Sequence, residues 1–344
     1  MRSAMLFGPR DLRIVETPDP APPPPGMVKL RFGAGGICGS DLSYYGKFKV
    51  GDFDVREPIV LGHEVAGEVV ETGAGVTRVK AGDRVAVNPN QPCRVCRTCV
   101  AGQGNLCLQM NFYGSAAVYP HIQGVFREYI VCSEAQCFAV PGGLDFRIAA
   151  MAEPLAVTMH AVNRAGSLLG KHLLITGCGP IGCLTLMVAR RAGAASITVT
   201  DLSDAALARA LKLGADRAVN SATQADQVEA WYANKGTFDI SIECSGSSPG
   251  MNTAILATAS GGRVVQVGMM GETPVPINRL MSREVDYVGA FRFDREYAWA
   301  VAELANGRID VAPLLTHSYR MEKANDAFVV AADRSQSMKV HLTL

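Results

Sequence analysis

The chain has 344 residues and a formal net charge of +1, without any long basic or acidic block, which argues against a nucleic-acid partner and against electrostatic attraction to membranes. It has no uninterrupted apolar run of about 18 residues and no signal-peptide core at its N-terminus, so we expect a cytoplasmic protein without membrane segments. Ten cysteines in such a reducing compartment point to metal binding or catalysis rather than to disulfide bonds.

Residues 1–150 contain short apolar runs that predict β-strands. Examples are MVKLRF, EVAGEVVE and DRVAVNP, which glycine and proline residues separate from one another. The proline-rich stretch at 17–26 has no helical potential and predicts a surface turn. We therefore expect a β-rich, partly barrel-like first domain.

Within this domain, Cys38 lies in GGICGSDLSYYG, whose glycines disfavour a helix. A lone cysteine often serves only as a small apolar residue, whereas a metal-binding thiolate needs partners. His63 and Glu64 follow in LGHEVAGEVV, and Glu153 comes later in AMAEPLAV. One cysteine, one histidine and one carboxylate leave a fourth position open, which is typical of a catalytic zinc site. Each residue alone has an ordinary structural explanation, so only the set predicts a metal centre.

Four more cysteines share one short loop, CRVCRTCVAGQGNLC. Four thiolates at these spacings can surround a tetrahedral zinc, and reduced surface cysteines are the less convincing alternative. Because protein ligands would fill all four positions, no place remains for a substrate, and this zinc is expected to be structural. Its ligands are Cys93, Cys96, Cys99 and Cys107.

From about residue 151 helices and strands alternate. DFRIAAMAEPLAVTMHAVNRAG has apolar residues at helical spacing and predicts a helix that ends at Gly166. From Lys171 onward, strands are predicted for HLLITG, SITVTD, FDISIECSG and RVVQVGM, with helices between them. This order predicts an α/β domain over 151–290 with a doubly wound parallel sheet. The helical EYAWAVAELANG and the strand-like MKVHLTL lie beyond it, so we expect 291–344 to return to the first domain.

The glycine-rich motif GCGPIG joins the first strand of this domain to its helix. G-x-G-x-x-G is weak evidence alone, but here it lies between an apolar strand and an apolar helix, as dinucleotide binding requires; a tight turn without a ligand is the alternative. The next strand ends at Asp201, whose carboxylate suits a ribose diol and repels a 2′-phosphate, so NAD is expected in preference to NADP. The motif residues, which approach the pyrophosphate at the helix N-terminus, are Gly177, Gly179, Pro180, Ile181 and Gly182.

Together these motifs resemble the zinc-containing medium-chain dehydrogenase/reductases, from about residue 25 onward. EPLAVTMHA resembles the sorbitol dehydrogenase branch of that family, and NPNQPCRVC, NFYGSAAVYPHIQGVF and GAFRF are most similar to L-idonate 5-dehydrogenases. The resemblance implies a GroES-like catalytic domain formed by 1–150 and 291–344, and a Rossmann domain over 151–290 that binds NAD. It also implies two zinc ions per chain and a homodimer or homotetramer.

The resemblance further implies roles for individual residues. Cys38 and His63 ligate the catalytic zinc, and Glu64, Glu153 or both complete its ligands. Asp41 orients His63, while Ser40 holds the substrate hydroxyl and accepts or relays its proton. The remaining implied contacts are those of Asp201, Val267 and Gly268 with NAD, and those of Tyr44, Tyr45 and Arg292 with the substrate.

One position departs from the family pattern. A histidine often stands five residues after the zinc cysteine and ends a proton relay to solvent, but this chain has Ser43 there. The departure leaves the metal site intact and leaves the exit route of the proton open.

The expected function is the reversible, NAD-dependent oxidation of a secondary alcohol on a sugar acid or polyol, with L-idonate to 5-keto-D-gluconate as the specific reaction. A neutral polyol such as sorbitol or xylitol is the main alternative, because Arg292 can pair with a carboxylate but an arginine there also occurs in relatives that act on neutral polyols. A non-enzymatic nucleotide-binding protein that kept the fold is a remote alternative, since Cys38 and His63 are both present.

Overall fold

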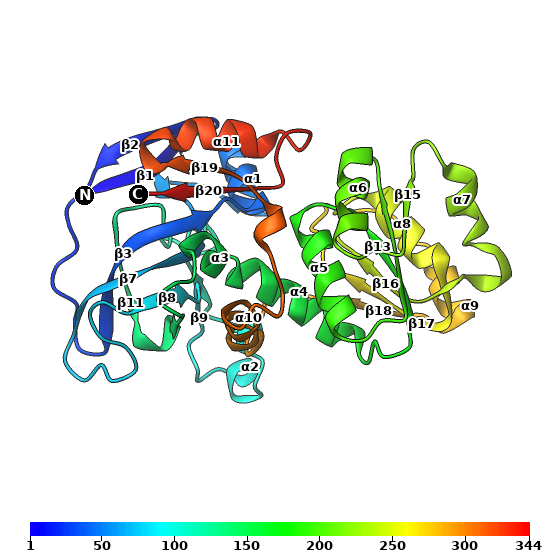
Figure 1. Cartoon of the computed structure of the whole chain (residues 1–344), viewed down its shortest axis with the longest axis horizontal. Helices are drawn as coiled ribbons and strands as arrows, with labels where there is room; N and C mark the ends of the chain where they lie inside the picture. Colours follow the sequence, from blue (N-terminus) through cyan, green and yellow to red (C-terminus); the bar gives the residue numbers. More distant parts are fainter. The chain divides into compact units, whose positions relative to one another are not determined.

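The computed structural model describes all residues, 1–344, and divides them into two compact units (Figure 1). Unit 1 consists of Met1–Glu153 and Tyr297–Leu344, and unit 2 consists of Pro154–Glu296. Unit 1 is therefore built from two segments of the chain, and unit 2 is one continuous segment between them. None of the helices combines the length and the apolar character needed to cross a bilayer.

The framework of unit 1 is a seven-stranded sheet with the order β12-β8-β7-β3-β20-β19, in which β11 also pairs with β3. Strand β3 is antiparallel to β7, β11 and β20, whereas β19 and β20 are parallel to each other. A three-stranded sheet, β2-β1-β6, and the pairs β4-β5 and β9-β10 complete the strands. The bounds are β1 Arg2–Gly8, β2 Asp11–Glu16, β3 Met27–Gly36, β4 Lys49–Val50, β5 Phe53–Asp54, β6 Ile59–Val60, β7 Glu64–Thr72, β8 Arg84–Val87, β9 Asn90–Gln91, β10 Asn111–Phe112, β11 Tyr129–Ser133, β12 Cys137–Ala139, β19 Leu315–Arg320 and β20 Lys339–Thr343.

Short helices connect these strands. Helix α1 begins at Gly39, so the expectation that the glycines around Cys38 disfavour a helix is wrong from there on; Asp41 in its first turn accepts a hydrogen bond from the Cys38 amide and caps the helix. Helix α2 lies in the four-cysteine loop. Helix α11 lies between β19 and β20 in the chain. The bounds are α1 Gly39–Lys47, α2 Arg97–Val100, α3 Phe146–Ala150, α10 Glu296–Ala305 and α11 Ala324–Ala332.

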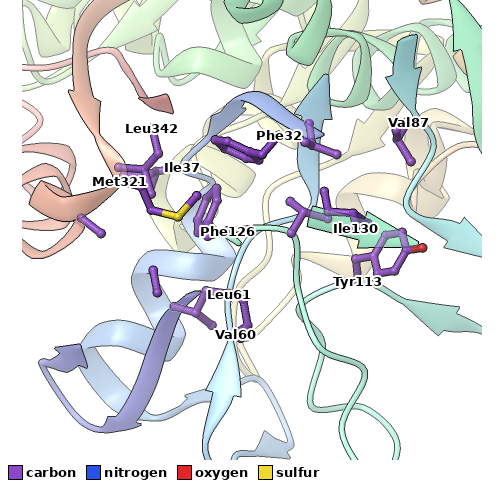
Figure 2. Packing of buried hydrophobic residues seen from close by; sticks show 14 of the residues in the cluster. Phe32, Ile37, Val60, Leu61, Val87, Tyr113, Phe126, Ile130, Met321 and Leu342 are labelled. Atoms are coloured by element: carbon purple, nitrogen blue, oxygen red, sulfur yellow. The ribbon is translucent and has the colours of Figure 1, made fainter. Parts of the chain in front are cut away.

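The hydrophobic core of unit 1 anchors the segments that contain the candidate metal ligands. Buried and less buried residues alternate along β3, so that Phe32 enters the core. Its ring packs edge-to-face on Phe126, with the ring centroids 6.5 Å apart (Figure 2). Ile37 and Leu61 belong to the same cluster and are 5% and 0% exposed. Ile37 directly precedes Cys38, and Leu61 lies two residues before His63. The core therefore fixes the backbone next to both candidate metal ligands.

Unit 2 is built on a six-stranded sheet with the order β15-β14-β13-β16-β17-β18, and all of its pairings are parallel. The predicted doubly wound sheet is thereby confirmed. Strand β13 is buried along almost its whole length, as expected of a strand covered on both faces. The strand order reverses between β13 and β16, and such a point forms a ligand crevice at the carboxyl ends of the strands. The bounds are β13 His172–Thr176, α5 Pro180–Arg191, β14 Ser196–Asp201, α6 Asp204–Lys212, β15 Arg217–Asn220, α7 Ala225–Ala230, β16 Phe238–Glu243, α8 Ser248–Ala257, β17 Thr258–Gln266, α9 Ile277–Arg283 and β18 Asp286–Gly289.

The helix predicted to end at Gly166 is divided in two. Helix α3 ends at Ala150, and α4 spans Ala152–Ala165. Pro154, the third residue of α4, explains the division, because proline is tolerated in the first turn of a helix but not in its interior. The division places Glu153 in the first turn of a new helix, rather than in the middle of a long one.

Candidate functional site

The four-cysteine loop of unit 1 brings its thiols together. Cys96 is the N-cap of α2, Cys99 lies within that helix, and Cys107 ends a short 3-10 turn. The four Sγ atoms lie within 4.8 Å of one another, and those of Cys96 and Cys107 are 3.9 Å apart. Zn–S bonds of about 2.3 Å in a tetrahedron separate the sulfurs by about 3.8 Å. The spacing of these four thiols therefore fits a zinc ion.

Hydrogen bonds in this loop stabilise thiolates. The amides of Cys93 and Cys96 donate to the Sγ atoms of Cys107 and Cys93, at 3.2 and 3.4 Å. The hydroxyl of Thr98 lowers the pKa of Cys96 to about 5, whereas desolvation raises the pKa of Cys99 to about 12. Because zinc binds the thiolate and not the thiol, a bound dication would keep all four sulfurs deprotonated together.

A second cluster of possible ligands lies where β3 ends. Strand pairing places Gly36, the last residue of β3, opposite Glu64, the first residue of β7. Cys38 follows Gly36 by two residues and His63 directly precedes Glu64, so the register brings Cys38 and His63 to the same place. The Sγ of Cys38, a ring nitrogen of His63 and a carboxylate oxygen of Glu64 lie within 4.8 Å of one another.

Asp41 connects the two segments of this cluster. Its carboxylate is 0% exposed and accepts hydrogen bonds from the amides of Cys38 at 2.9 Å and Gly62 at 3.0 Å. One of its oxygens lies 3.7 Å from Nδ1 of His63, an ion-pair distance rather than a hydrogen bond. Burial opposes a charge on His63, but Asp41 and Cys38 outweigh it and raise its pKa to about 10. A zinc ion at this site would therefore compete with a proton for His63.

Lys339 of strand β20 forms a buried ion pair with Glu64. Its Nζ lies 2.5 Å from each carboxylate oxygen and donates to Oε1, while Oε2 has no hydrogen-bond partner. The two side chains are 3% and 0% exposed. A Cβ atom on Gly36 would collide with Glu64 Oε2 and lie 2.8 Å from Cε of Lys339, so the pair crosses β3 over a glycine. The ammonium therefore contacts both oxygens of Glu64, and a metal bound to this carboxylate would share it with Lys339.

Glu153 lies in the same buried region but outside the group of three ligand atoms that are within 4.8 Å of one another. Its side chain is buried, with 4% of the residue exposed. Burial raises its pKa to about 7; Glu64 adds to this effect, and His63 and Lys339 oppose it. Of the two carboxylates that the sequence left open, Glu64 is the one grouped with Cys38 and His63.

The charges of this cluster suit a dication. Asp41, Glu64 and Glu153 are buried acids, and Lys339 is the lysine that faces them. Buried carboxylates need a paired cation, a metal or several hydrogen-bond donors, because an isolated buried charge is very costly. With a carboxylate oxygen of Glu64 within 4.8 Å of the ligand atoms of a cysteine and a histidine, the donors present fit a zinc ion with an open position.

The residues of α1 that follow Cys38 differ in their surroundings. Ser40 is half-buried in the first turn, and Ser43 donates to the carbonyl of Gly39 at 3.1 Å. Tyr44 and Tyr45 are in the hydrophobic core, 4% and 7% exposed. The hydroxyl of Tyr44 accepts a hydrogen bond from the Ala116 amide at 3.0 Å, and that of Tyr45 donates to Asn325 at 3.0 Å. Both tyrosines thus have a packing role, and a contact with substrate stays a prediction.

The glycines of the GCGPIG motif in unit 2 meet three different requirements. Gly177 has φ +90°, and a Cβ there would lie 2.7 Å from Ser245. A Cβ on Gly182 would collide with the carbonyl of Gly177, so this glycine permits close packing of α5 on β13. Gly179 is the N-cap of α5 and has nothing within 4 Å of its Cβ position, which leaves open space at the helix N-terminus. An anion such as a pyrophosphate is stabilised by the amides and dipole there. Pro180 and Ile181 are the first residues of the helix.

The carboxylate of Asp201 is held at the end of β14. It accepts hydrogen bonds from the amides of Cys178 at 2.6 Å and Ser203 at 2.9 Å. The amides of Val267 and Gly268, after β17, both donate to the carbonyl of Glu243 at 2.9 Å. These groups all lie at the carboxyl ends of the parallel strands, where the fold offers a crevice to a dinucleotide.

Arg292 lies in unit 2, whereas the metal clusters lie in unit 1. Its backbone has φ +55°, and its guanidinium lies over the ring of Phe291 at 4.9 Å from the centroid. Its contact with a substrate stays a prediction.

Two buried charged residues were missed by the sequence reasoning, Lys339 and Glu243. Lys339 stands in the apolar stretch MKVHLTL, where a lysine inside a buried strand signals an acidic partner. Glu243 ends the apolar strand FDISIE and is 0% exposed. In both, the signal was a charge within a continuous apolar run.

Comparisons with known proteins agree with this geometry. Residues 24–142 match the model of the alcohol dehydrogenase GroES-like domain, and residues 180–306 match the zinc-binding dehydrogenase model. An L-idonate 5-dehydrogenase (NAD(P)(+)) of Escherichia coli is 42% identical over 309 residues, which cover 90% of this chain and 89% of that protein. A sorbitol dehydrogenase of Gallus gallus is 39% identical over 336 residues, covering 96% and 93%. The crystal structure of L-idonate 5-dehydrogenase from E. coli superimposes with a TM-score of 0.95 at 39% identity, over 100% of this chain and 98% of that one.

Proposed function

Because this chain belongs to the zinc-binding alcohol dehydrogenases, we propose that it oxidises a secondary hydroxyl of a sugar acid with NAD, the specific reaction being L-idonate to 5-keto-D-gluconate and its reverse. The observation that supports this most is the 42% identity to an L-idonate 5-dehydrogenase over 90% of the chain. The cluster of Cys38, His63 and Glu64 provides the ligands for a catalytic metal.

In this proposal Cys38, His63 and Glu64 hold the catalytic zinc, and Asp41 fixes the segments on which they lie. Bound at these residues, zinc would supply Lewis acidity toward a substrate hydroxyl, and NAD in unit 2 would supply the hydride acceptor. Ser40 accepts the hydroxyl proton and passes it on. Ser43 cannot take up a proton as an imidazole does, and its hydroxyl already donates to Gly39, so water completes the route to solvent.

We further propose two zinc ions per chain and a preference for NAD over NADP. The four-cysteine loop supports the second zinc, and the fixed carboxylate of Asp201 supports the coenzyme preference. The E. coli relative bears the name NAD(P)(+), so the preference is a matter for measurement. In steady-state kinetics NAD should be used at least about tenfold more efficiently than NADP, since a carboxylate facing a phosphate is repulsive. Asp201→Ala should bring the catalytic efficiencies with NAD and NADP closer together, mainly by weakening the binding of NAD.

The substrate is tested by an NAD-linked activity screen of L-idonate, D-gluconate, sorbitol, xylitol and L-threonine. The proposal expects the highest kcat/KM for L-idonate. A higher value for sorbitol or xylitol would select the second candidate, a polyol dehydrogenase, which the 39% identity to sorbitol dehydrogenase favours. Absence of activity with every substrate, in protein that contains zinc, would favour a non-enzymatic nucleotide-binding protein.

Substitution of Arg292 can test whether the substrate is a sugar acid or a neutral polyol. If its guanidinium pairs with a carboxylate, Arg292→Gln should raise KM for L-idonate about tenfold, because a charge-assisted hydrogen bond contributes about 1.5–3 kcal/mol. KM for sorbitol should change less. Equal losses on both substrates would assign Arg292 to packing, as its position over Phe291 allows.

We also propose that the protein works in the cytoplasm as a homodimer or homotetramer. All ten cysteines are free thiols, which suits a reducing compartment. Light scattering of the purified protein would determine its assembly.

A further inference from the structure

Glu243 is a buried carboxylate whose partners are all neutral. It is the last residue of β16 and 0% exposed. Five groups donate hydrogen bonds to it: the Ser245 amide at 2.8 Å, the Ser245 hydroxyl, the Gly246 amide at 3.1 Å, the Thr176 hydroxyl at 3.4 Å and Nε2 of Gln266 at 2.6 Å. A buried ion without a countercharge persists where many dipoles point at it.

These donors come from the ends of three neighbouring strands. Thr176 ends β13 and precedes the glycine motif, Ser245 and Gly246 follow β16, and Gln266 ends β17 (Figure 1). The sheet order places β13, β16 and β17 side by side. The backbone carbonyl of Glu243 also accepts the amides of Val267 and Gly268, both at 2.9 Å. One residue therefore joins all three loops at the point where the strand order reverses.

The loops that Glu243 joins have no free space between them. A Cβ on Gly177 would lie 2.7 Å from Ser245, and a Cβ on Gly268 would lie 2.6 Å from Oε2 of Glu243. A Cβ on Gly246 would lie 2.6 Å from the carbonyl of Met269. A shift of the Ser245–Gly246 turn must therefore move the backbone at Gly177 or Gly268. Both positions follow the carboxyl ends of parallel strands, where the fold predicts the nucleotide crevice.

The two halves of such a sheet serve the two halves of a dinucleotide. A dinucleotide lies across the point of reversal, with its adenosine ribose at the acidic residue that ends the second strand. In this chain that residue is Asp201 at the end of β14. The ends of β16 and β17, where Glu243 acts, belong to the other half and so to the nicotinamide nucleotide.

We propose that Glu243 is a positioning residue for the nicotinamide half of the dinucleotide site. It does not contact the adenosine half, and it acts through the turn at Ser245–Gly246 and the backbone at Val267–Gly268. The proposal rests on the proposed nucleotide-binding function. It requires the carboxylate, because an amide in its place turns an NH₂ group toward donors whichever way it is oriented.

The test compares NADH with ADP, which contains the adenosine half alone. Glu243→Gln should weaken NADH binding about tenfold or more, the effect of one buried donor left without an acceptor, and change ADP binding less than about twofold. Kd values are measured by calorimetry on the full-length, zinc-loaded protein. Glu229→Gln is the matched control, because Glu229 is an exposed acid of the same unit, and it should change neither Kd. Asp201→Ala should weaken both ligands.

The outcomes separate the two proposals. Wild-type protein that binds neither NADH nor ADP would contradict the nucleotide-binding function itself. If the wild type binds both ligands, the role of Glu243 is overturned when Glu243→Gln keeps its affinity for both, or when its affinity for NADH and its affinity for ADP fall equally. If Glu243→Gln does not fold, Gln266→Met decides, because it removes the side-chain link between Glu243 and Gly268, in which Nε2 of Gln266 donates to both, and keeps the carboxylate. A several-fold loss for NADH alone supports the proposal, and unchanged NADH binding overturns it.

Discussion

Replacing Lys339 with methionine should have an effect that depends on metal. The substitution keeps an unbranched side chain as far as Cε and removes the ammonium group, leaving Glu64 as a 0% exposed carboxylate without its partner. Removing one member of a buried ion pair destabilises a protein by about 3–5 kcal/mol. We expect a loss of this size in the metal-free protein. A zinc ion at Glu64 would replace the missing positive charge, so the loss should fall to about 1 kcal/mol when metal is bound, the level of an exposed pair.

This difference implies a change in metal affinity. Suppose that the substitution lowers the free energy of unfolding by about 3 kcal/mol without metal and by about 1 kcal/mol with zinc bound. The thermodynamic cycle of zinc binding and unfolding then requires the variant to bind zinc about 30-fold more tightly than the wild type does. The four-cysteine site is the same in both proteins, so its contribution cancels.

The assay is urea denaturation of the wild type and Lys339→Met, each zinc-loaded and after chelation, combined with competition against a chelator for zinc affinity. Lys339→Arg is the control that keeps the charge. Glu64→Gln combined with Lys339→Met should recover part of the metal-free loss, because no buried charge is then left unpaired. Equal losses with and without zinc, or a metal-free loss below about 0.5 kcal/mol, would refute the reasoning.

Three other predictions concern metal content, pH and proton transfer. Metal analysis should find two zinc ions per chain. Cys96→Ser should lose one zinc ion and become less stable, whereas Cys38→Ser should lose one zinc ion and its activity. Burial, with Lys339 and Arg147 nearby, lowers the pKa of His341 to about 3, so the folded protein keeps it neutral. The neutral His341 contributes fully to the free energy of unfolding above pH 6.5, the approximate pKa of histidine in the unfolded chain. This contribution is lost as pH falls toward 3, at about 1.4 kcal/mol per pH unit. His341→Leu should remove that slope from denaturation measured between pH 6.5 and 5, and an unchanged slope would assign the acid sensitivity to other groups. Ser40→Ala should reduce kcat about a hundredfold as a lost acid/base partner, while Ser43→Ala should have little effect; similar losses would make Ser43 an obligatory member of the relay.

The sequence predicted those features that depend on residues close together in the chain. The four cysteines share one loop, so their spacing in sequence is already their spacing in space, and the glycine motif lies within a single strand–turn–helix. The alternation of strands and helices after Lys171 likewise follows from neighbouring residues, and it predicted the parallel sheet that the structure has.

Long-range pairing determines what the sequence left open. Cys38 and His63 meet because β3 and β7 pair with Gly36 opposite Glu64, and no spacing shows that register. Lys339 is separated from Glu64 by 275 positions and reaches it only because β20 pairs with β3. The packing of α1 places Tyr44 and Tyr45 in the core, which their sequence did not show, and the substrate contact that the family resemblance implies for them stays a prediction.

The pairing of β20 with β3 has a consequence for synthesis of the protein. Unit 2 is one continuous segment and can fold on the ribosome as soon as Glu296 has emerged. The main sheet of unit 1 still lacks an inner strand at that time, and Glu64 still lacks its countercharge, until residues 339–343 are made. The half of the protein that is translated first is therefore completed last, and chaperones would meet an open β-sheet edge at which Glu64 has no countercharge.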